Sequence, residues 1–344
     1  PAQLHDYAVY PVAGNVVPFI APIAGGRAEG LVWQNLTAAQ MARLDAYEGA
    51  FGYSFGPVEV QTAQGPRTAQ AYLPPVEMAA GVGDWSLADW EAGHQTPAVL
   101  AAQELFSLDP IPDYAQLRAM WPMIEARAWA KFRATAAPAT HRFHAKADDF
   151  TVDKADPPAG RFFRFQGTTI SHRKFDGSRS DGLRREGFLG VDASVLLPYD
   201  PVRDRVLLVE QARLGPALRH DPNPWMLEPI AGIVDARETP QDAALREAKE
   251  EAGLDIKSLE PAGAFYVSPG CSTDFFYTFV GLCSLPQDVP YSGGLDDEAE
   301  DLRLHPLGFD AALDLADQGE IQTGPALYLL YWLLRHRDRL RAAV

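Results

Sequence analysis

One run of 23 residues, from Gly232 to Leu254, constrains the fold of this chain more than any other feature. It reads GIVDARETPQDAALREAKEEAGL. Thr239 followed by Pro240 is typical of a helix start, because the hydroxyl caps free backbone N–H groups and proline has no N–H to lose there. Gly253 predicts the helix end, since glycine accepts the left-handed conformation. The run therefore predicts a loop followed by one helix.

Three glutamates of this helix, Glu247, Glu250 and Glu251, stand at i, i+3 and i+4. This spacing puts their carboxylates on one helix face, within roughly 5–6 Å of one another. Like charges so placed repel by about a few tenths of a kcal/mol, so the cluster favours a bound cation. Mg²⁺ fits best, because it takes oxygen ligands and is completed by substrate phosphates. The alternative is a solvated acidic helix face.

The run also matches a family pattern: Gly, five residues, Glu, seven residues, Arg-Glu, two residues, Glu-Glu, one residue, Gly and an aliphatic residue. The fixed positions here are Gly232, Glu238, Arg246, Glu247, Glu250, Glu251, Gly253 and Leu254. In this respect the run resembles the Nudix box, with no departure at any fixed position. The resemblance implies metal-dependent cleavage of a pyrophosphate, and an α/β/α sandwich around a mixed sheet.

Motifs outside the box resemble one Nudix subfamily, the ADP-ribose pyrophosphatases. They are Pro269, which stands 15 residues beyond Leu254, and the segments HRKFDG at 172–177, VEQAR at 209–213 and GLDDEAED at 294–301. This resemblance implies hydrolysis of ADP-ribose to AMP and ribose 5-phosphate with Mg²⁺, or with Mn²⁺ in its place. The alternatives are another nucleotide sugar or dinucleotide as substrate, and a sensor that binds ADP-ribose without turnover.

The resemblance also implies a role for each candidate site residue. The metal ligands would be the carbonyl of Ala231 and the carboxylates of Glu247, Glu250, Glu251 and Glu300. Glu298 would act as the base, with Glu250 assisting and Arg246 orienting a metal-binding glutamate, while Glu238 would hold the loop. The substrate would be bound by Arg185, Glu186, Arg213 and Pro269. Plain salt bridges at the charged substrate residues, and an acidic surface loop around Glu298, remain the alternatives.

The beginning of the chain resembles a second family. Residues 36–60, LTAAQMARLDAYEGAFGYSFGPVEV, followed by QAYLP, resemble the γ-glutamylcyclotransferase-like fold, with Glu48 at the catalytic position. That resemblance implies a small β-barrel-like domain. The family's Tyr-Gly-x-Leu loop does not occur in residues 1–30, so the opening strand is expected to lie before Pro1 or the site to be lost. We therefore expect Glu48 to be a structural or solvated carboxylate without cyclotransferase activity.

Periodicity and composition organise the chain as an α+β protein of two domains. We expect the cyclotransferase-like domain with trailing helices over 1–135, a Pro- and Ala-rich linker over 136–157, and the Nudix domain over 158–344. In the last of these, strands are expected at 191–198, 206–211, 263–267, 275–283 and 302–306, and helices near 309–318 and 324–340. Helices are also expected over 86–133.

The net charge and the cysteine content limit the classes of partner and the cellular location that can be expected. The chain has 30 basic and 46 acidic residues, a formal net charge of −16, which disfavours nucleic acid or an anionic membrane as the main partner. Only Cys271 and Cys283 are present, which favours a reducing, cytoplasmic location with free thiols. The subfamily resemblance implies a homodimer. Fusions of these two domains resemble proteins associated with tellurite resistance, which indicates no particular chemistry.

Overall fold

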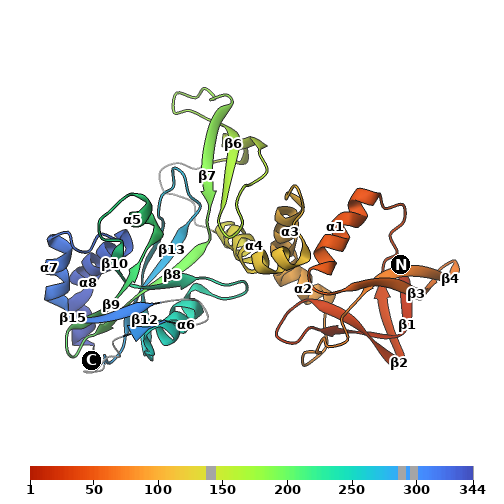
Figure 1. Ribbon diagram of the computed structural model, residues 1–344, viewed down its shortest axis with the longest axis horizontal. Coiled ribbons are helices and arrows are strands. Elements are labelled where there is room, and N and C mark those ends of the chain that lie inside the picture. The colour runs from red at the N-terminus through yellow and green to blue at the C-terminus, as the bar shows by residue number, and fades with distance from the viewer. Residues whose placement is uncertain (137–144, 286–291, 295–300, 344) are drawn as a thin grey trace. The chain divides into compact units, whose positions relative to one another are not determined.

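The computed structural model describes residues 1–136, 145–285, 292–294 and 301–343. The chain divides into two compact units, Pro1–Arg185 and Glu186–Val344, and each is described by itself (Figure 1). The division falls within one strand, so the expected domain limits at 135 and 158 stay predictions.

The first unit begins with an open antiparallel sheet in the order β2-β1-β3-β4. Its strands are β1 (Ala2–Pro11), β2 (Pro18–Gly30), β3 (Ser54–Thr62) and β4 (Gly65–Leu73). Leu4, Val58 and Val60 form its small core. The expected small β domain is confirmed, but its described strands do not close a barrel. Only the first residues of β1, Ala2 to Leu4, pair with β3, while β1 pairs with β2 over most of its length.

One helix lies between strands of this sheet in the sequence, and the others follow it, as predicted for residues 86–133. They are α1 (Ala38–Gly49), which lies between β2 and β3, and then α2 (Leu87–Gly93), α3 (Gln95–Phe106) and α4 (Tyr114–Ala134). Aromatic side chains pack between α4 and the end of α1. Trp121 of α4 meets Tyr47 and Phe51 edge to face, with ring centroids 5.6 and 5.0 Å away.

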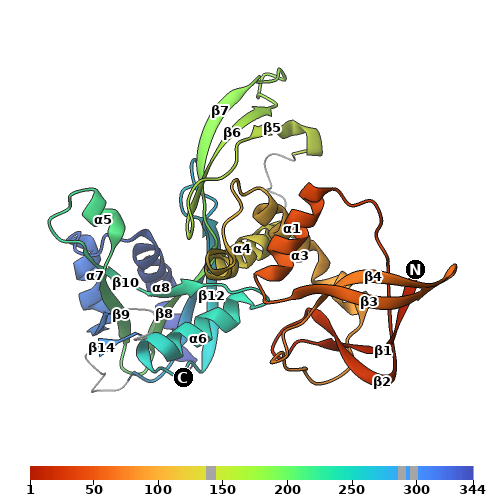
Figure 2. The same cartoon turned by 45° about the vertical axis from the view of Figure 1, so that its right-hand side comes forward.

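A three-stranded sheet completes the first unit. Its order is β5-β6-β7, with β5 (Phe150–Ala155), β6 (Arg164–His172) and β7 (Leu183–Leu189) (Figure 2). The short 3-10 helix η1 (Ala147–Asp149) and β5 lie inside the range expected to be a linker. Sequence patterns missed β5 because five of its six residues are exposed, so no alternation of apolar and polar residues marks it.

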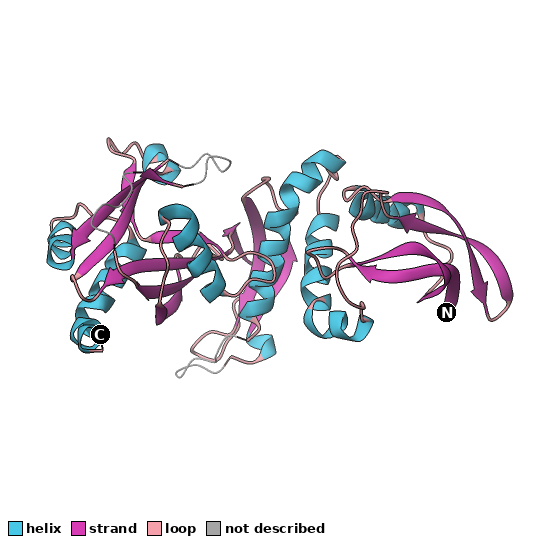
Figure 3. Ribbon diagram, turned by 90° about the horizontal axis from the view of Figure 1, so that it is seen from below, coloured by secondary structure: helices cyan, strands magenta, loops and turns pink. Residues whose placement is uncertain are grey.

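The second unit is a mixed sheet between helices, which confirms the expected α/β/α sandwich (Figure 3). The order is β12-β13-β8-β9-β15-β14, with β10 paired to β9 and β11 to β8. The strands are β8 (Asp192–Asp200), β9 (Arg205–Ala212), β10 (Trp225–Glu228), β11 (Ile230–Ile233), β12 (Ser258–Tyr266), β13 (Phe275–Leu282), β14 (Ser292–Gly293) and β15 (Leu302–Gly308). The pair β8 and β13 is parallel, and the other pairs are antiparallel.

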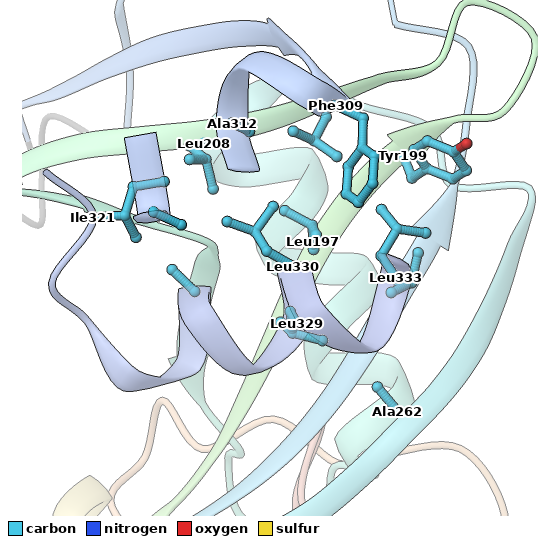
Figure 4. Close-up of a cluster of buried hydrophobic side chains, with 14 of the residues drawn as sticks. Leu197, Tyr199, Leu208, Ala262, Phe309, Ala312, Ile321, Leu329, Leu330 and Leu333 are labelled. Carbon is cyan, nitrogen blue, oxygen red and sulfur yellow. The ribbon is translucent and has the colours of Figure 1, made fainter. Parts of the chain in front are cut away.

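Helices cover both faces of this sheet. They are α5 (Leu214–Leu218), α6 (Pro240–Ala252), α7 (Phe309–Asp317) and α8 (Gly324–Ala342). On one face, side chains of α8 such as Leu329 and Leu333 pack with Leu197 of β8 and Phe309 of α7 (Figure 4). On the other face, α6 packs its alanines on the sheet. The helix over 240–252 therefore has one face free for its charged residues.

Among the described helices, none is both long enough and apolar enough to span a bilayer.

Candidate functional site

The loop and helix of the box adopt the local structure that the sequence predicts. The Thr239 hydroxyl accepts a hydrogen bond from the backbone N–H of Asp242 at 3.1 Å, and Pro240 occupies the first turn. Gly253 ends the helix at φ 64°, in the left-handed region. Ala244 and Ala248 are buried against the sheet. They fix the position of α6 on the sheet.

Arg246 is the centre of the charged cluster. Its Nη1 donates to Glu247 Oε1 at 2.6 Å and to Glu250 Oε2 at 2.9 Å. Its Nε and Nη2 donate to the two carboxylate oxygens of Glu238, at 3.0 and 3.1 Å. These carboxylates raise the pKa of Arg246, chiefly through the hydrogen bonds to Glu238 and against the opposing effect of burial. One guanidinium thus contacts three glutamates, and the expected role of Arg246 in orienting a metal-binding glutamate stays a prediction.

Glu238 also fixes the loop before the helix. Its Oε2 accepts from the backbone N–H of Asp235 at 3.1 Å, and Arg246 Nη2 donates to the carbonyl of Ile233 at 3.1 Å. These bonds confirm that Glu238 holds the loop, and they attach the end of β11 to the middle of α6.

Gly232 brings Glu247 onto the backbone of β11. A Cβ at position 232 would lie only 1.7 Å from Glu247 Oε1, so the carboxylate occupies the space that a side chain would need. The neighbouring carbonyl is that of Ala231, an expected metal ligand. Glycine at this position is therefore a requirement of the close approach between carboxylate and strand.

Glu251 is the most enclosed of the glutamates, with 2% of its surface exposed. The segment at β14 contacts the backbone of Glu251, because Gly294 N–H donates to the Glu251 carbonyl at 3.2 Å. A Cβ on Gly293 would lie 1.8 Å from that oxygen. Glu298 and Glu300, the expected base and further ligand, lie outside the described residues. The described residue before them, Gly294, is bonded to α6.

The chemistry of these donors fits a hard divalent cation. Within the described residues, no group of three or more His, Cys, Asp or Glu side chains is arranged to hold a metal ion as it stands. However, one guanidinium faces Glu238, Glu247 and Glu250, so negative charge is in excess. Glu251, on the same helix, is buried, and a bound cation would offset part of the cost of burying its carboxylate. Oxygen ligands in this number are what Mg²⁺ and Mn²⁺ take.

Replacement of Arg246 by lysine tests its orienting role. Arg246→Lys keeps the charge but loses the planar fork that reaches Glu238, Glu247 and Glu250 together. We expect kcat to fall by about 10- to 100-fold and the Mg²⁺ requirement to rise, measured by metal titration of turnover. Arg219→Lys, in the exposed segment after α5, is the control and should leave both unchanged. An Arg246→Lys enzyme with normal metal dependence would contradict this role.

The expected substrate residues occupy other positions. Arg213 donates from its Nε to Glu228 Oε2 at 2.6 Å. The Nε of Arg213 therefore takes part in a salt bridge, which was the alternative to substrate binding. Glu228 begins a Glu-x-x-Ala-Gly segment before the box, which also resembles the ADP-ribose pyrophosphatases, but the sequence suggested no role for this glutamate. Arg185 and Glu186 are exposed on β7, and Arg185 Nη1 donates to the carbonyl of Arg184 at 2.7 Å.

Pro269 lies in an exposed turn between β12 and β13. The turn is joined to the end of β7, because Phe188 N–H donates to the Cys271 carbonyl at 2.7 Å and Thr273 N–H to the Phe188 carbonyl at 3.1 Å. The structure therefore brings the turn that contains Pro269 to the end of β7, the strand that also carries Glu186.

Glu48 of the first unit lies on α1 and is partly buried, and burial raises its pKa. Tyr47 beside it has its pKa raised to about 12 by burial and by the charge of Glu48. This position fits a structural carboxylate. The absence of cyclotransferase activity at Glu48 stays a prediction.

Family models match both parts of the chain. A NUDIX domain model matches residues 189–321, and a model described as Gamma-glutamyl cyclotransferase, AIG2-like matches residues 1–92. Among solved structures, one described as an ADP compounds hydrolase aligns with a TM-score of 0.44 at 19% identity, covering 58% of this chain and 98% of the other.

Curated relatives match about half of the chain. The ADP-ribose pyrophosphatase of Escherichia coli (strain K12) is 38% identical over 182 residues, which are 52% of this chain and 85% of the relative. That of Haemophilus influenzae is 36% identical over 174 residues, 50% of this chain and 80% of the relative. The GDP-mannose pyrophosphatase of Enterobacter sp. (strain 638) is 30% identical over 163 residues, 46% of this chain and 84% of the relative.

The matched segments extend beyond the family model. The match to the Escherichia coli relative, 182 residues, is longer than the 133 residues of the NUDIX domain model. It also covers most of the relative's own length. With a complete box on a mixed sheet between helices, this chain belongs to the Nudix family.

Proposed function

We propose that the chain hydrolyses the pyrophosphate of ADP-ribose to AMP and ribose 5-phosphate with a bound Mg²⁺, for which Mn²⁺ can substitute. The observation that carries the proposal is the carboxylate cluster of α6, oriented by Arg246 and seated against the backbone of Gly232. The 38% identity to an enzyme named for ADP-ribose supports that substrate. The lower identity, 30%, to a GDP-mannose pyrophosphatase makes a nucleotide sugar of that kind the second candidate.

The carbonyl of Ala231 and the carboxylates of Glu247, Glu250 and Glu251 would hold the cation, with Glu300 as a further ligand. When bound, the cation polarises the phosphoryl oxygens and offsets the charge of the leaving phosphate. Arg246 keeps Glu247 and Glu250 in one orientation, and Glu238 keeps Arg246 in place. These hydrogen bonds limit the orientations that Glu247 and Glu250 can adopt before the cation binds.

Glu298 is proposed as the base that accepts a proton from the attacking water. The water oxygen bonds to one phosphorus, the bond from that phosphorus to the bridging oxygen breaks, and the bridging oxygen leaves with the other phosphate. Both products then carry one phosphate group each, which matches AMP and ribose 5-phosphate.

The substrate is proposed to be bound by Arg185, Glu186, Arg213 and Pro269. Arg213 uses its Nε for Glu228 and is 42% exposed, so its terminal nitrogens can still donate to a phosphate. A carboxylate such as that of Glu186 can accept from a ribose hydroxyl or an adenine amine.

Removal of the metal tests the proposed function directly. We expect AMP release from ADP-ribose with Mg²⁺, loss of the release with excess EDTA, and recovery when Mg²⁺ or Mn²⁺ is restored. GDP-mannose, UDP-glucose, diadenosine polyphosphates and NADH, assayed in parallel, should be cleaved more slowly. A preference for GDP-mannose would change the assigned substrate and leave the proposed mechanism unchanged. Tight binding of ADP-ribose without turnover would indicate a sensor and not an enzyme.

We also propose a homodimer in the cytoplasm. The three-stranded sheet of the first unit and its loops expose large apolar side chains, which a second copy could cover: Phe150, Val152, Phe162, Phe163 and Phe165. The mass in solution, measured by light scattering, should be twice 37.6 kDa, and Val152→Lys should lower it. A monomer at micromolar concentration would contradict the proposal. An exposed Cys271 that stays unpaired fits a reducing compartment.

A further inference from the structure

A buried ionic cluster lies in the first unit, within residues 93–188, which neither family model matches. Its members are Glu104 of α3, Arg127 of α4 and Arg164, the first residue of β6. They are 6%, 1% and 1% exposed. Arg127 Nη2 lies 2.7 Å from Glu104 Oε1, and Arg164 Nη1 lies 3.6 Å from the same oxygen. Two guanidiniums thus share one carboxylate.

Stability alone does not account for such a cluster. Burial of three charged groups is costly, and apolar side chains of similar volume often serve a core equally well. The charges do not balance, and burial lowers the pKa of Arg164, with Arg127 adding to the effect and Glu104 opposing it. A buried ion cluster is better explained where its directed hydrogen bonds fix one arrangement of the backbone.

The two arginines hold the loop between β5 and β6. Arg127 Nη1 donates to the Phe162 carbonyl at 3.0 Å, and Arg164 Nη2 donates to the Pro158 carbonyl at 2.7 Å. Between these carbonyls the loop turns tightly at Gly160, where φ is +102° and a Cβ would lie 2.2 Å from the Phe163 carbonyl oxygen. The loop therefore has little room to shift while both bonds exist.

The same loop is joined to β7 across β6. Asp156 donates its N–H to the Gly167 carbonyl at 2.9 Å, and its carboxylate is paired with Arg184 of β7. A Cβ at Gly167 would lie 2.0 Å from Arg184 Nη2, so the guanidinium lies directly across the β6 backbone. Arg184 is followed by Arg185, whose Nη1 donates to the Arg184 carbonyl. A continuous series of contacts thus leads from α3 to Arg185.

We infer that Glu104, Arg127 and Arg164 form a positioning cluster by which helices α3 and α4 hold β6 and β7, and with them Arg185, in the arrangement that binds substrate. The inference rests on the proposed function in one respect, namely that Arg185 contacts ADP-ribose. It gives the helical region before β5 a role in the pyrophosphatase reaction. The three residues act through Arg185 and do not themselves touch substrate.

A double-mutant cycle between Glu104 and Arg185 tests this inference in the full chain. Glu104→Gln should raise KM for ADP-ribose about tenfold and change kcat by less than about twofold, because binding geometry is lost and the metal site is not. Arg185→Ala should raise KM at least as much. If the cluster acts through Arg185, the double variant should have the KM of Arg185→Ala within about twofold.

Further variants separate positioning from folding. Glu104→Gln leaves two buried guanidiniums and can unfold the unit, so a triple variant, Glu104→Met with Arg127→Met and Arg164→Met, removes the charges while filling similar volume. It should fold and show the same rise in KM. Tyr72→Phe is the control, because it removes a side-chain hydrogen bond to Asp45 elsewhere in the unit, and its KM should be that of the wild type.

Hydrogen exchange of residues 158–189 gives a readout that does not depend on turnover. Faster exchange at β7 in the triple variant, and not in Tyr72→Phe, supports the positioning cluster. Unchanged exchange, or a rise in KM equally large with and without Arg185→Ala, overturns it. If the wild type releases no AMP, the proposed function fails on its own, and exchange at β7 alone then decides whether the cluster holds that strand.

Discussion

Gly232→Ala should reduce kcat/KM for ADP-ribose by at least about 100-fold, because the added methyl would lie 1.7 Å from Glu247 Oε1 and displace that carboxylate. The affinity for Mg²⁺ should fall as well, since Glu247 is a proposed ligand and Arg246 is bonded to it. The measurement is kcat/KM across a Mg²⁺ titration, with thermal unfolding recorded beside it.

Gly215→Ala provides a matched control for this change. Gly215 lies in α5, and a Cβ built there meets no atom within 4 Å. It should keep wild-type activity. Equal activity in Gly232→Ala and the wild type would show that Glu247 need not rest on β11 for turnover.

Glu251→Gln should lower kcat by about 1000-fold or more, because a neutral amide cannot replace a buried carboxylate as ligand to a cation that bears the reaction's charge. Without metal, the variant should be as stable as the wild type or more so, since an amide is less costly to bury than a carboxylate. Single-turnover AMP release and metal-free thermal unfolding measure the two effects.

Glu320→Gln, at an exposed position between α7 and α8, serves as the control for loss of one negative charge. Wild-type kcat in Glu251→Gln would remove Glu251 from the metal site. A large loss of stability without metal would instead indicate a structural role.

The sequence was sufficient for the box because its determinants are local. The cap at Thr239, the stop at Gly253 and the helical spacing of the glutamates each depend on neighbours within a few residues. The strands at 192–200 and 205–212 were predictable for a related reason: they are buried and apolar over most of their length.

Contacts between distant segments were not predictable. Glu104 meets Arg127 across 23 residues, and nothing in either neighbourhood indicates the pairing. The hydrogen bonds of β5 to β6 involve the backbone, which a pattern of side chains does not reveal. The pair of Arg213 with Glu228 joins the residue after β9 to the last residue of β10, and it depends on the register of these two strands.

The strand order of the second unit has a consequence for synthesis of the chain. Strand β9 lies between β8 and β15, and β15 is completed only at Gly308, about a hundred residues after β9 begins. Until then the backbone of β9 presents an open edge, and Phe309 has not yet covered the apolar face behind it. A nascent chain that stalls within residues 213–301 would therefore expose the unpaired backbone N–H and C=O groups of β9, which can pair with other chains. Such stalled intermediates should depend most on chaperones.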